Sequence, residues 1–302
     1  MRVRIFFLVC LVNYVSFLQG MTNPESTLYQ FVKNLVENNS TLAEFYHNEF
    51  YEKATVLWGK VKQECTPEER KRFDDYFNNA LYSLNKQSSG LLTSPTSEDK
   101  IPLTLVQTVE EAAIAFNISI GRISRNTIMQ LTGKTKWGEI VNIDAIKMNS
   151  FLDLNNNFYH KLDINLPILR DMSPNESRGM IYHECAHASS QDVVRRAALM
   201  YACNTNNYTD LLKENTYLRE LYELEEYYAD TKAVLSSLKS AFDITSLLFP
   251  YRSELSFTET SNPSPPLALR YLKATMLADK LKLEKAMRKK DGKNNFLDKC
   301  ST

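Results

Sequence analysis

The pentapeptide at residues 183–187 reads H-E-C-A-H, with two histidines four residues apart and a glutamate directly after the first. On a helix, residues four apart lie one turn above each other on the same face, so His183 and His187 can offer two imidazole nitrogens to one Zn²⁺. Glu184 would lie beside that pair, where its carboxylate can act as a general base on a metal-bound water. The alternative interpretation is a helix with two partly exposed histidines that bind no metal. A third candidate ligand elsewhere in the chain would favour the metal site.

A zinc site needs at least one more protein ligand, and the chain has only four histidines. None follows His187, so the third ligand is a carboxylate or one of the upstream histidines, His47 and His160. Glu226 is the candidate carboxylate, because it starts a pattern at i, i+3, i+4 and i+7 that has two alanines and includes Asp230. Taken alone, this segment also fits a solvated acidic helix. Joined to H-E-x-x-H, it predicts a His₂Glu site in which Asp230 accepts the free N–H of a ligand imidazole.

The H-E-x-x-H and E-x-x-A-D segments together resemble the gluzincin zinc metallopeptidases, the family of HtpX and the CAAX prenyl endopeptidases with their soluble periplasmic relatives. The segment S-P-P-L-A-L-R at residues 264–270 is similar to the family's H-P-P-L-x-x-R, and the resemblance covers roughly residues 139–272. It implies one zinc ion per chain and a zincin-like fold. It also implies a role for each matching residue: zinc ligands His183, His187 and Glu226, base Glu184, ligand support from Asp230, and a place in the active-site wall for Arg270.

The chain departs from the family at Ser264, where the family has a histidine. That histidine is thought to help stabilise the oxyanion, and removal of one such donor can cost about 10²–10³ in rate. Tyr227, Tyr228 and Arg270 are candidates to replace it. Slow, narrowly specific or lost peptidase activity is therefore an open alternative.

The N-terminus predicts a secretory signal peptide at residues 1–20. Arg2 and Arg4 precede an apolar run that ends near Gly20 and is too short for a comfortable membrane span. We therefore expect a secreted or periplasmic protein, with an uncleaved N-terminal anchor as the alternative. No other segment reaches the length of continuous apolar sequence that a membrane helix needs.

Composition and cysteine content bear on nucleic-acid binding and on disulfide formation. The 302 residues include 36 basic and 36 acidic side chains, so no basic excess indicates nucleic-acid binding. Outside the signal peptide the cysteines are Cys65, Cys185, Cys203 and Cys300, an even number compatible with disulfides. We expect Cys185 and Cys203 on one helix, about 27 Å apart, which would prevent their pairing.

The remaining patterns predict a mainly helical α+β protein. A helical N-terminal region and linker cover residues 21–100, and a zincin-like metallopeptidase domain with a small β-sheet covers 101–302. Helices are expected at about 173–203 and 209–240, with β-like alternation between 138 and 167. Within that alternation, Ile164-Asn165-Leu166-Pro167 is the candidate edge strand for pairing with an extended substrate, since an edge strand tolerates proline.

Together these patterns predict a zinc-dependent metalloendopeptidase that hydrolyses internal peptide bonds of protein or peptide substrates through Glu184. The first alternative is a secreted pseudo-peptidase that holds zinc and binds protein partners. The second is a helical interaction protein in which the motifs are accidental. The substrate and the oligomeric state are left open.

Overall fold

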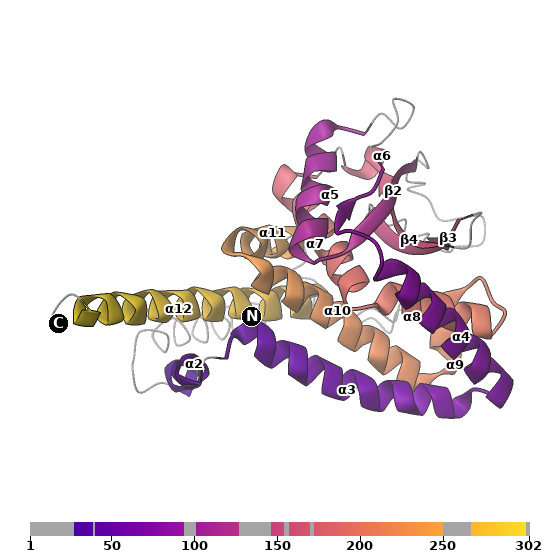
Figure 1. Ribbon diagram of the computed structural model, residues 1–302, viewed down its shortest axis with the longest axis horizontal. Coiled ribbons are helices and arrows are strands. Elements are labelled where there is room, and N and C mark those ends of the chain that lie inside the picture. Colours follow the sequence, from indigo (N-terminus) through magenta and orange to yellow (C-terminus); the bar gives the residue numbers. More distant parts are fainter. Residues whose placement is uncertain are drawn as a thin grey trace, which may run out of the picture.

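A computed structural model describes most of the chain, namely residues 27–38, 40–93, 101–126, 146–153, 157–169, 172–249 and 267–299. These residues are mainly helical and include one small mixed sheet, which confirms the predicted α+β class (Figure 1). The predicted signal peptide, Ser264 and Cys300 lie outside the described residues.

The described part of the N-terminal region is helical, as predicted. It consists of α2 (Thr27–Glu37), α3 (Leu42–Glu64) and α4 (Pro67–Leu84). Thr41 and Thr66 each begin a helix with a capping box, in which the threonine side chain and a glutamate three residues later satisfy each other's backbone N–H groups. Helix α3 runs alongside α10 (Thr216–Ser236) over much of its length (Figure 1).

The sheet orders its strands β1-β2-β4-β3, with β3 antiparallel to β4 and the other pairs parallel. The elements of this region are β1 (Gly90–Leu91), α5 (Leu103–Ala115), β2 (Ser119–Asn126), β3 (Ile146–Leu152), β4 (Phe158–Asn165) and α6 (Leu166–Leu169). Strand β3 is therefore the last strand on one side of the sheet.

The predicted edge strand is wrong. Ile164 lies in β4, an interior strand, and pairs with Arg125 of β2 on one side and Ile146 of β3 on the other. The strand ends at Asn165, and Pro167 belongs to the short helix α6. Pro167 therefore does not indicate whether β4 is an edge strand, because a proline after the end of a strand removes no hydrogen bond between strands.

Helix α7 (Pro174–Ser189) begins as predicted, with Ser173 as N-cap and proline in the first turn. It does not continue to residue 203. Gln191 adopts a left-handed conformation with φ of 66°, the chain turns, and α8 (Asp192–Ala202) begins. The expected separation of Cys185 and Cys203 along one helix is therefore wrong. Cys65, Cys185 and Cys203 are free thiols.

The predicted helix at 209–240 is also divided. It comprises α9 (Tyr208–Glu214), α10 and the start of α11 (Leu238–Leu248). Asn215 and Ser237 separate these helices, and the side chain of each accepts a hydrogen bond from the backbone N–H three residues later. Asparagine and serine stabilise a helix start better than a helix interior, so both residues favour breaks.

Three apolar clusters form the core of the described residues, and α10 contributes to the two larger ones. One lies between the sheet, α5, α7 and α10–α12, and includes Ile120, Leu162 and Ile181. The other joins α3, α4, α8, α9 and α10, and includes Phe50 and Leu221. Helix α10 is thus held on two sides by buried apolar contacts, which restricts the position of any side chain that it presents to α7.

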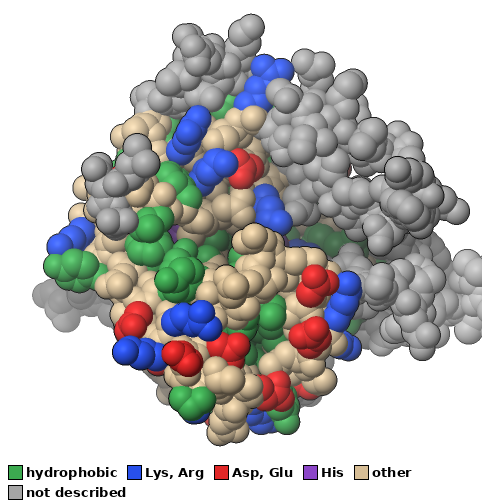
Figure 2. Space-filling model, turned by 90° about the vertical axis from the view of Figure 1, so that its right-hand side faces the viewer, with side chains coloured by type: hydrophobic (Ala, Val, Ile, Leu, Met, Phe, Trp, Pro, Cys, Tyr) green, Lys and Arg blue, Asp and Glu red, His purple; other side chains and the backbone are tan. Residues whose placement is uncertain are grey.

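Helix α12 (Leu267–Lys299) starts against α10 and α11 and extends away from the rest of the molecule (Figure 1). None of the described helices has both the length and the apolar character that a membrane span requires. Acidic and basic side chains are interspersed on the face shown in Figure 2, consistent with the zero net charge.

Gly179 sets the distance between α7 and α11. A Cβ atom at this position would lie 2.7 Å from the backbone carbonyl oxygen of Asp243, an atom that cannot move without shifting α11. We expect Gly179→Ala to lower the free energy of unfolding by about 1–2 kcal/mol, since overpacking outweighs the gain in helix propensity. Thermal unfolding followed by circular dichroism measures the effect.

Gly59→Ala on α3 is the matched control for this prediction. A Cβ atom there meets nothing within 4 Å, so the substitution should leave the melting temperature unchanged or raise it slightly. A Gly179→Ala protein that melts at or above the parent temperature would contradict the inferred close contact.

Candidate metal centre

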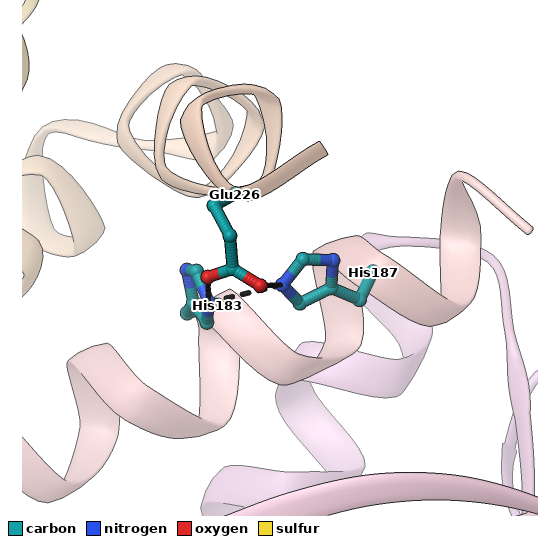
Figure 3. A group of neighbouring side chains, drawn as sticks. All are labelled: His183, His187 and Glu226. Atoms are coloured by element: carbon teal, nitrogen blue, oxygen red, sulfur yellow. Dashed lines mark hydrogen bonds and ion pairs between the residues drawn. The ribbon is translucent and has the colours of Figure 1, made fainter. Parts of the chain in front are cut away.

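Three buried side chains from α7 and α10 direct ligand atoms at one another (Figure 3). The Nε2 atoms of His183 and His187 are 3.1 Å apart. Glu226 reaches down from α10 between the two rings, with one carboxylate oxygen 3.4 Å from His183 Nε2 and the other 3.3 Å from His187 Nε2. The predicted third ligand therefore lies with the two histidines.

The local sequence explains this convergence. His183 and His187 lie one turn apart on α7, so their rings project from the same face. On α10, Ala229 and Ala233 are fully buried on the side that carries Glu226. Their small side chains allow α10 to approach α7 closely enough for the Glu226 carboxylate to reach both rings.

The second nitrogen of each imidazole is held by a carboxylate. His183 Nδ1 lies 2.9 Å from Asp230, as predicted, and His187 Nδ1 lies 3.0 Å from Asp192. Because a carboxylate accepts hydrogen bonds, each Nδ1 carries a proton, and in the neutral imidazole Nε2 then keeps its lone pair. Neutral rings would face the Glu226 carboxylate with two lone pairs in a buried space, so the site needs positive charge, either from a metal ion or from protons on the rings.

The electrostatics of the site also favour positive charge. Burial alone would lower the pKa of His187, but the adjacent carboxylates of Glu226 and Asp192 raise that pKa to about 10. The pKa of His183 is likewise raised, since the effects of Asp230 and Glu226 outweigh burial.

The donor set fits a metal ion. Ligand atoms of a tetrahedral zinc site, about 2.0–2.1 Å from the ion, lie roughly 3.3 Å from each other. The two Nε2 atoms are 3.1 Å apart, and they lie 3.4 and 3.3 Å from different oxygens of the Glu226 carboxylate. One atom from each of the three side chains lies within 4.8 Å of the other two. The three side chains could therefore hold a metal ion and leave one coordination position open. His160 and His47, the other candidates for the third ligand, do not belong to this group.

Arg270 is buried against the ligand group, 3.3 Å from Glu226 and 3.4 Å from His183 Nδ1. It is 8% exposed, and its guanidinium donates two hydrogen bonds to Asp230, of 2.6 and 2.8 Å. A third nitrogen lies 3.3 Å from Glu226. Burial raises the pKa of Asp230, but the Arg270 charge outweighs it and lowers that pKa to about 2. Arg270 therefore keeps Asp230 ionised behind His183.

Glu184 directly follows His183 on α7, and its carboxylate faces the sheet. Its carboxylate accepts a 2.7 Å hydrogen bond from the backbone N–H of Met148 in β3. The side of β3 that does not pair with β4 therefore faces the candidate base. This contact holds the carboxylate beside the edge of β3 that pairs with no other described strand, whereas the predicted edge at residues 164–167 lies elsewhere in the sheet.

The remaining predicted residues have other partners. Tyr228 stacks on Phe50 of α3 at 3.8 Å, and its hydroxyl is 2.9 Å from His47 Nδ1. It therefore belongs to the contact between α10 and α3. Tyr227 is partly buried, with the ammonium group of Lys273 3.5 Å from its ring centroid. His160 is buried in β4, where burial lowers its pKa to about 4.

Sequence reasoning missed Asp192 and Arg196. Asp192 follows His187 by five residues, and on a continuous helix it would point about 140° away from it. Only the turn at Gln191 brings Asp192 back to the imidazole. Arg196 pairs with Glu225 at 3.0 Å and lies 3.5 Å from Glu226, and no local pattern marks this residue.

Asp192 should contribute to metal affinity through His187. Replacing it by asparagine keeps the size but removes the charge that stabilises the protonated Nδ1. Loss of such an outer carboxylate typically weakens metal binding by about 10–100-fold. Competition with a fluorescent chelator measures the change. Asp210→Asn on the exposed surface of α9 is the control, and equal affinities of the two variants would contradict the assigned role.

Comparison of the chain with protein-family models, with curated proteins and with solved structures returned no match.

Proposed function

We propose that this protein is a zinc-dependent metalloendopeptidase of the gluzincin type, with a zincin-like domain. The observation that carries the proposal is the convergence of His183, His187 and Glu226, with Glu184 adjacent to His183 in sequence and hydrogen-bonded to the edge of β3 that pairs with no other described strand. A His₂Glu donor set with one position left for water or substrate is typical of catalytic zinc sites.

The residues have distinct roles in this proposal. His183, His187 and Glu226 hold the ion, while Asp230 and Asp192 fix the orientation of the two rings. When bound, Zn²⁺ supplies Lewis-acid chemistry that polarises the scissile carbonyl and makes water more acidic. Glu184 takes the proton of the attacking water and delivers it to the leaving amine.

The proposed substrate is an extended peptide that pairs with β3. Main-chain hydrogen bonds to a strand edge give affinity that depends little on sequence, and side pockets select residues. The N–H of Met148 identifies the edge that faces Glu184. A peptide aligned there would pass in front of both the base and the ligand group.

We also propose that residues 1–20 direct the chain to a secreted or periplasmic location, from the charged start and the apolar run of that segment.

Hydrolysis of an internally quenched peptide library tests the proposal directly. The zinc-loaded protein should cleave a subset of peptides at internal bonds, the chelated protein should not, and added Zn²⁺ should restore cleavage. Mass spectrometry of the products distinguishes internal cleavage from removal of terminal residues. A zinc-loaded protein that cleaves none of the peptides would rule out general endopeptidase activity.

A second candidate is a zinc-holding pseudo-peptidase that binds protein partners. It is favoured by the engagement of two predicted oxyanion donors, since Arg270 is bound to Asp230 and the Tyr228 hydroxyl to His47. This candidate predicts saturable binding of extended peptides to the zinc-loaded protein without turnover. Fluorescence anisotropy followed by mass spectrometry of the same samples separates the two functions.

A further inference from the structure

A crevice of about 710 Å³ opens between α3 and α10, away from the candidate metal ligands. Its volume falls within the range of pockets that hold small organic ligands. The walls come from the beginning of α3, the end of α5 and the last two turns of α10. Its chemistry is mixed, with one ammonium group, one imidazole and several apolar side chains.

Lys232 is the cation of the crevice, and its charge is poorly compensated. It is partly buried and forms no ion pair with a carboxylate of the described residues, while the Tyr228 ring centroid lies 5.8 Å from its ammonium group. The charge of Asp192 raises the pKa of Lys232, but burial outweighs this effect. The two oxygens of that carboxylate are already bound, one by His187 at 3.0 Å and the other by Arg195 at 3.1 Å.

The other charged and titratable groups of the crevice, His47 and Glu44, limit the charge of the anion that Lys232 could bind. Burial lowers the pKa of Lys232 to about 8 and that of His47 below its usual value, so near pH 7 the crevice carries mainly one positive charge. Glu44, at the rim, is exposed, and its carboxylate accepts a 2.7 Å hydrogen bond from the Thr41 N–H. A single cation beside a carboxylate rim favours a monoanion over a more highly charged ion.

Part of the crevice wall is apolar, beside polar residues such as Asn48 and Ser236. Phe116 at the end of α5, Tyr228 and Leu235 on α10, and Ala43 on α3 all line the crevice. Phe116 is 9% exposed and Tyr228 is 6% exposed, so both rings are held firmly by the surrounding core. The apolar surface that a compact ligand could still remove from water comes mainly from partly buried Leu235 and exposed Ala43.

We propose that this crevice binds a small organic monocarboxylate, with its carboxylate paired to Lys232 and its apolar body against Phe116 and Leu235. Binding would supply the charge partner that Lys232 lacks. The site is separate from the metal centre, so the proposal stands or fails independently of peptidase activity.

Titration of the full-length protein with hexanoate, followed by calorimetry and by the NMR signals of His47, tests the proposal. We expect saturable binding, shifted His47 signals, and at least tenfold weaker binding of hexanol, which has the same tail and no charge. Inorganic phosphate should also bind at least tenfold more weakly, since it has no apolar body.

Lys232→Met should weaken hexanoate binding at least tenfold, because it keeps the chain length and removes the charge. Lys239→Met on the exposed surface of α11 is the matched control and should bind as the parent does. If Lys232→Met melts at a lower temperature, Lys232→Arg, which retains the charge, serves as the second variant and should retain binding. Equal affinity for hexanol and hexanoate, tighter binding of phosphate, or no saturable binding to the parent protein would each overturn the proposal.

Discussion

Glu226→Ala is expected to reduce bound zinc from about one ion per chain to nearly none after dialysis. The two histidines alone leave the ion without its only anionic protein ligand, and a site with two protein ligands is not the usual tetrahedral arrangement. His183→Ala should have the same effect, because Glu226 contacts both rings. Elemental mass spectrometry on protein of known concentration gives the zinc content.

Glu223→Ala is the matched control for this experiment. Glu223 lies on α10 three residues before Glu226 and is exposed, so its removal should leave one zinc per chain. Zinc retained in Glu226→Ala would mean that another side chain supplies the third ligand. His47 and His160 would then return as candidates, although Tyr228 contacts the first and β4 buries the second.

Glu184→Gln should retain zinc and lose hydrolysis, with a fall in rate of about 10²–10⁴-fold. The glutamine side chain has nearly the same shape, and its carbonyl oxygen can still accept the hydrogen bond from Met148. It cannot take a proton from water near neutral pH. Steady-state cleavage of one peptide selected from the library, with zinc content measured on the same preparation, separates loss of the base from loss of the ion.

Glu176→Gln on the same helix controls for preparation and for a changed charge on α7. Glu176 occupies the capping box of α7, a position in which glutamine serves as well as glutamate. Its cleavage rate should equal that of the parent. Undiminished cleavage by Glu184→Gln, with zinc bound, would falsify the assignment of Glu184 as the base.

The parts of the candidate centre that depend on local spacing could be predicted from the sequence. His183 and His187 follow helical periodicity, and Glu226 and Asp230 share one face of α10 because they are four residues apart. The structure brings these four side chains together. The mainly helical α+β class was predictable for the same reason, since helix caps and periodic apolar residues are local signals.

The parts that depend on single backbone conformations or on distant pairing could not be predicted. The left-handed residue Gln191 ends α7 and moves Asp192 to His187, yet glutamine has no special preference for that conformation. The edge position of β3 follows from strand order, which alternation in one segment does not determine. Arg270 was assigned from the family resemblance and Tyr228 by residue type, and tertiary contacts decided which groups they bind.

The three candidate ligands lie on two separate helices, so a bound ion would slow degradation of the protein. An ion held by both would cross-link α7 to α10 around the segment that contains α8 and α9. Because it binds only the folded chain, it would add about 2.7 kcal/mol of stability at a free concentration of 100 times Kd. Without the ion this cross-link is missing and the region opens more readily, and opened chains are the ones that proteases destroy. The supply of zinc would then set how long each copy survives.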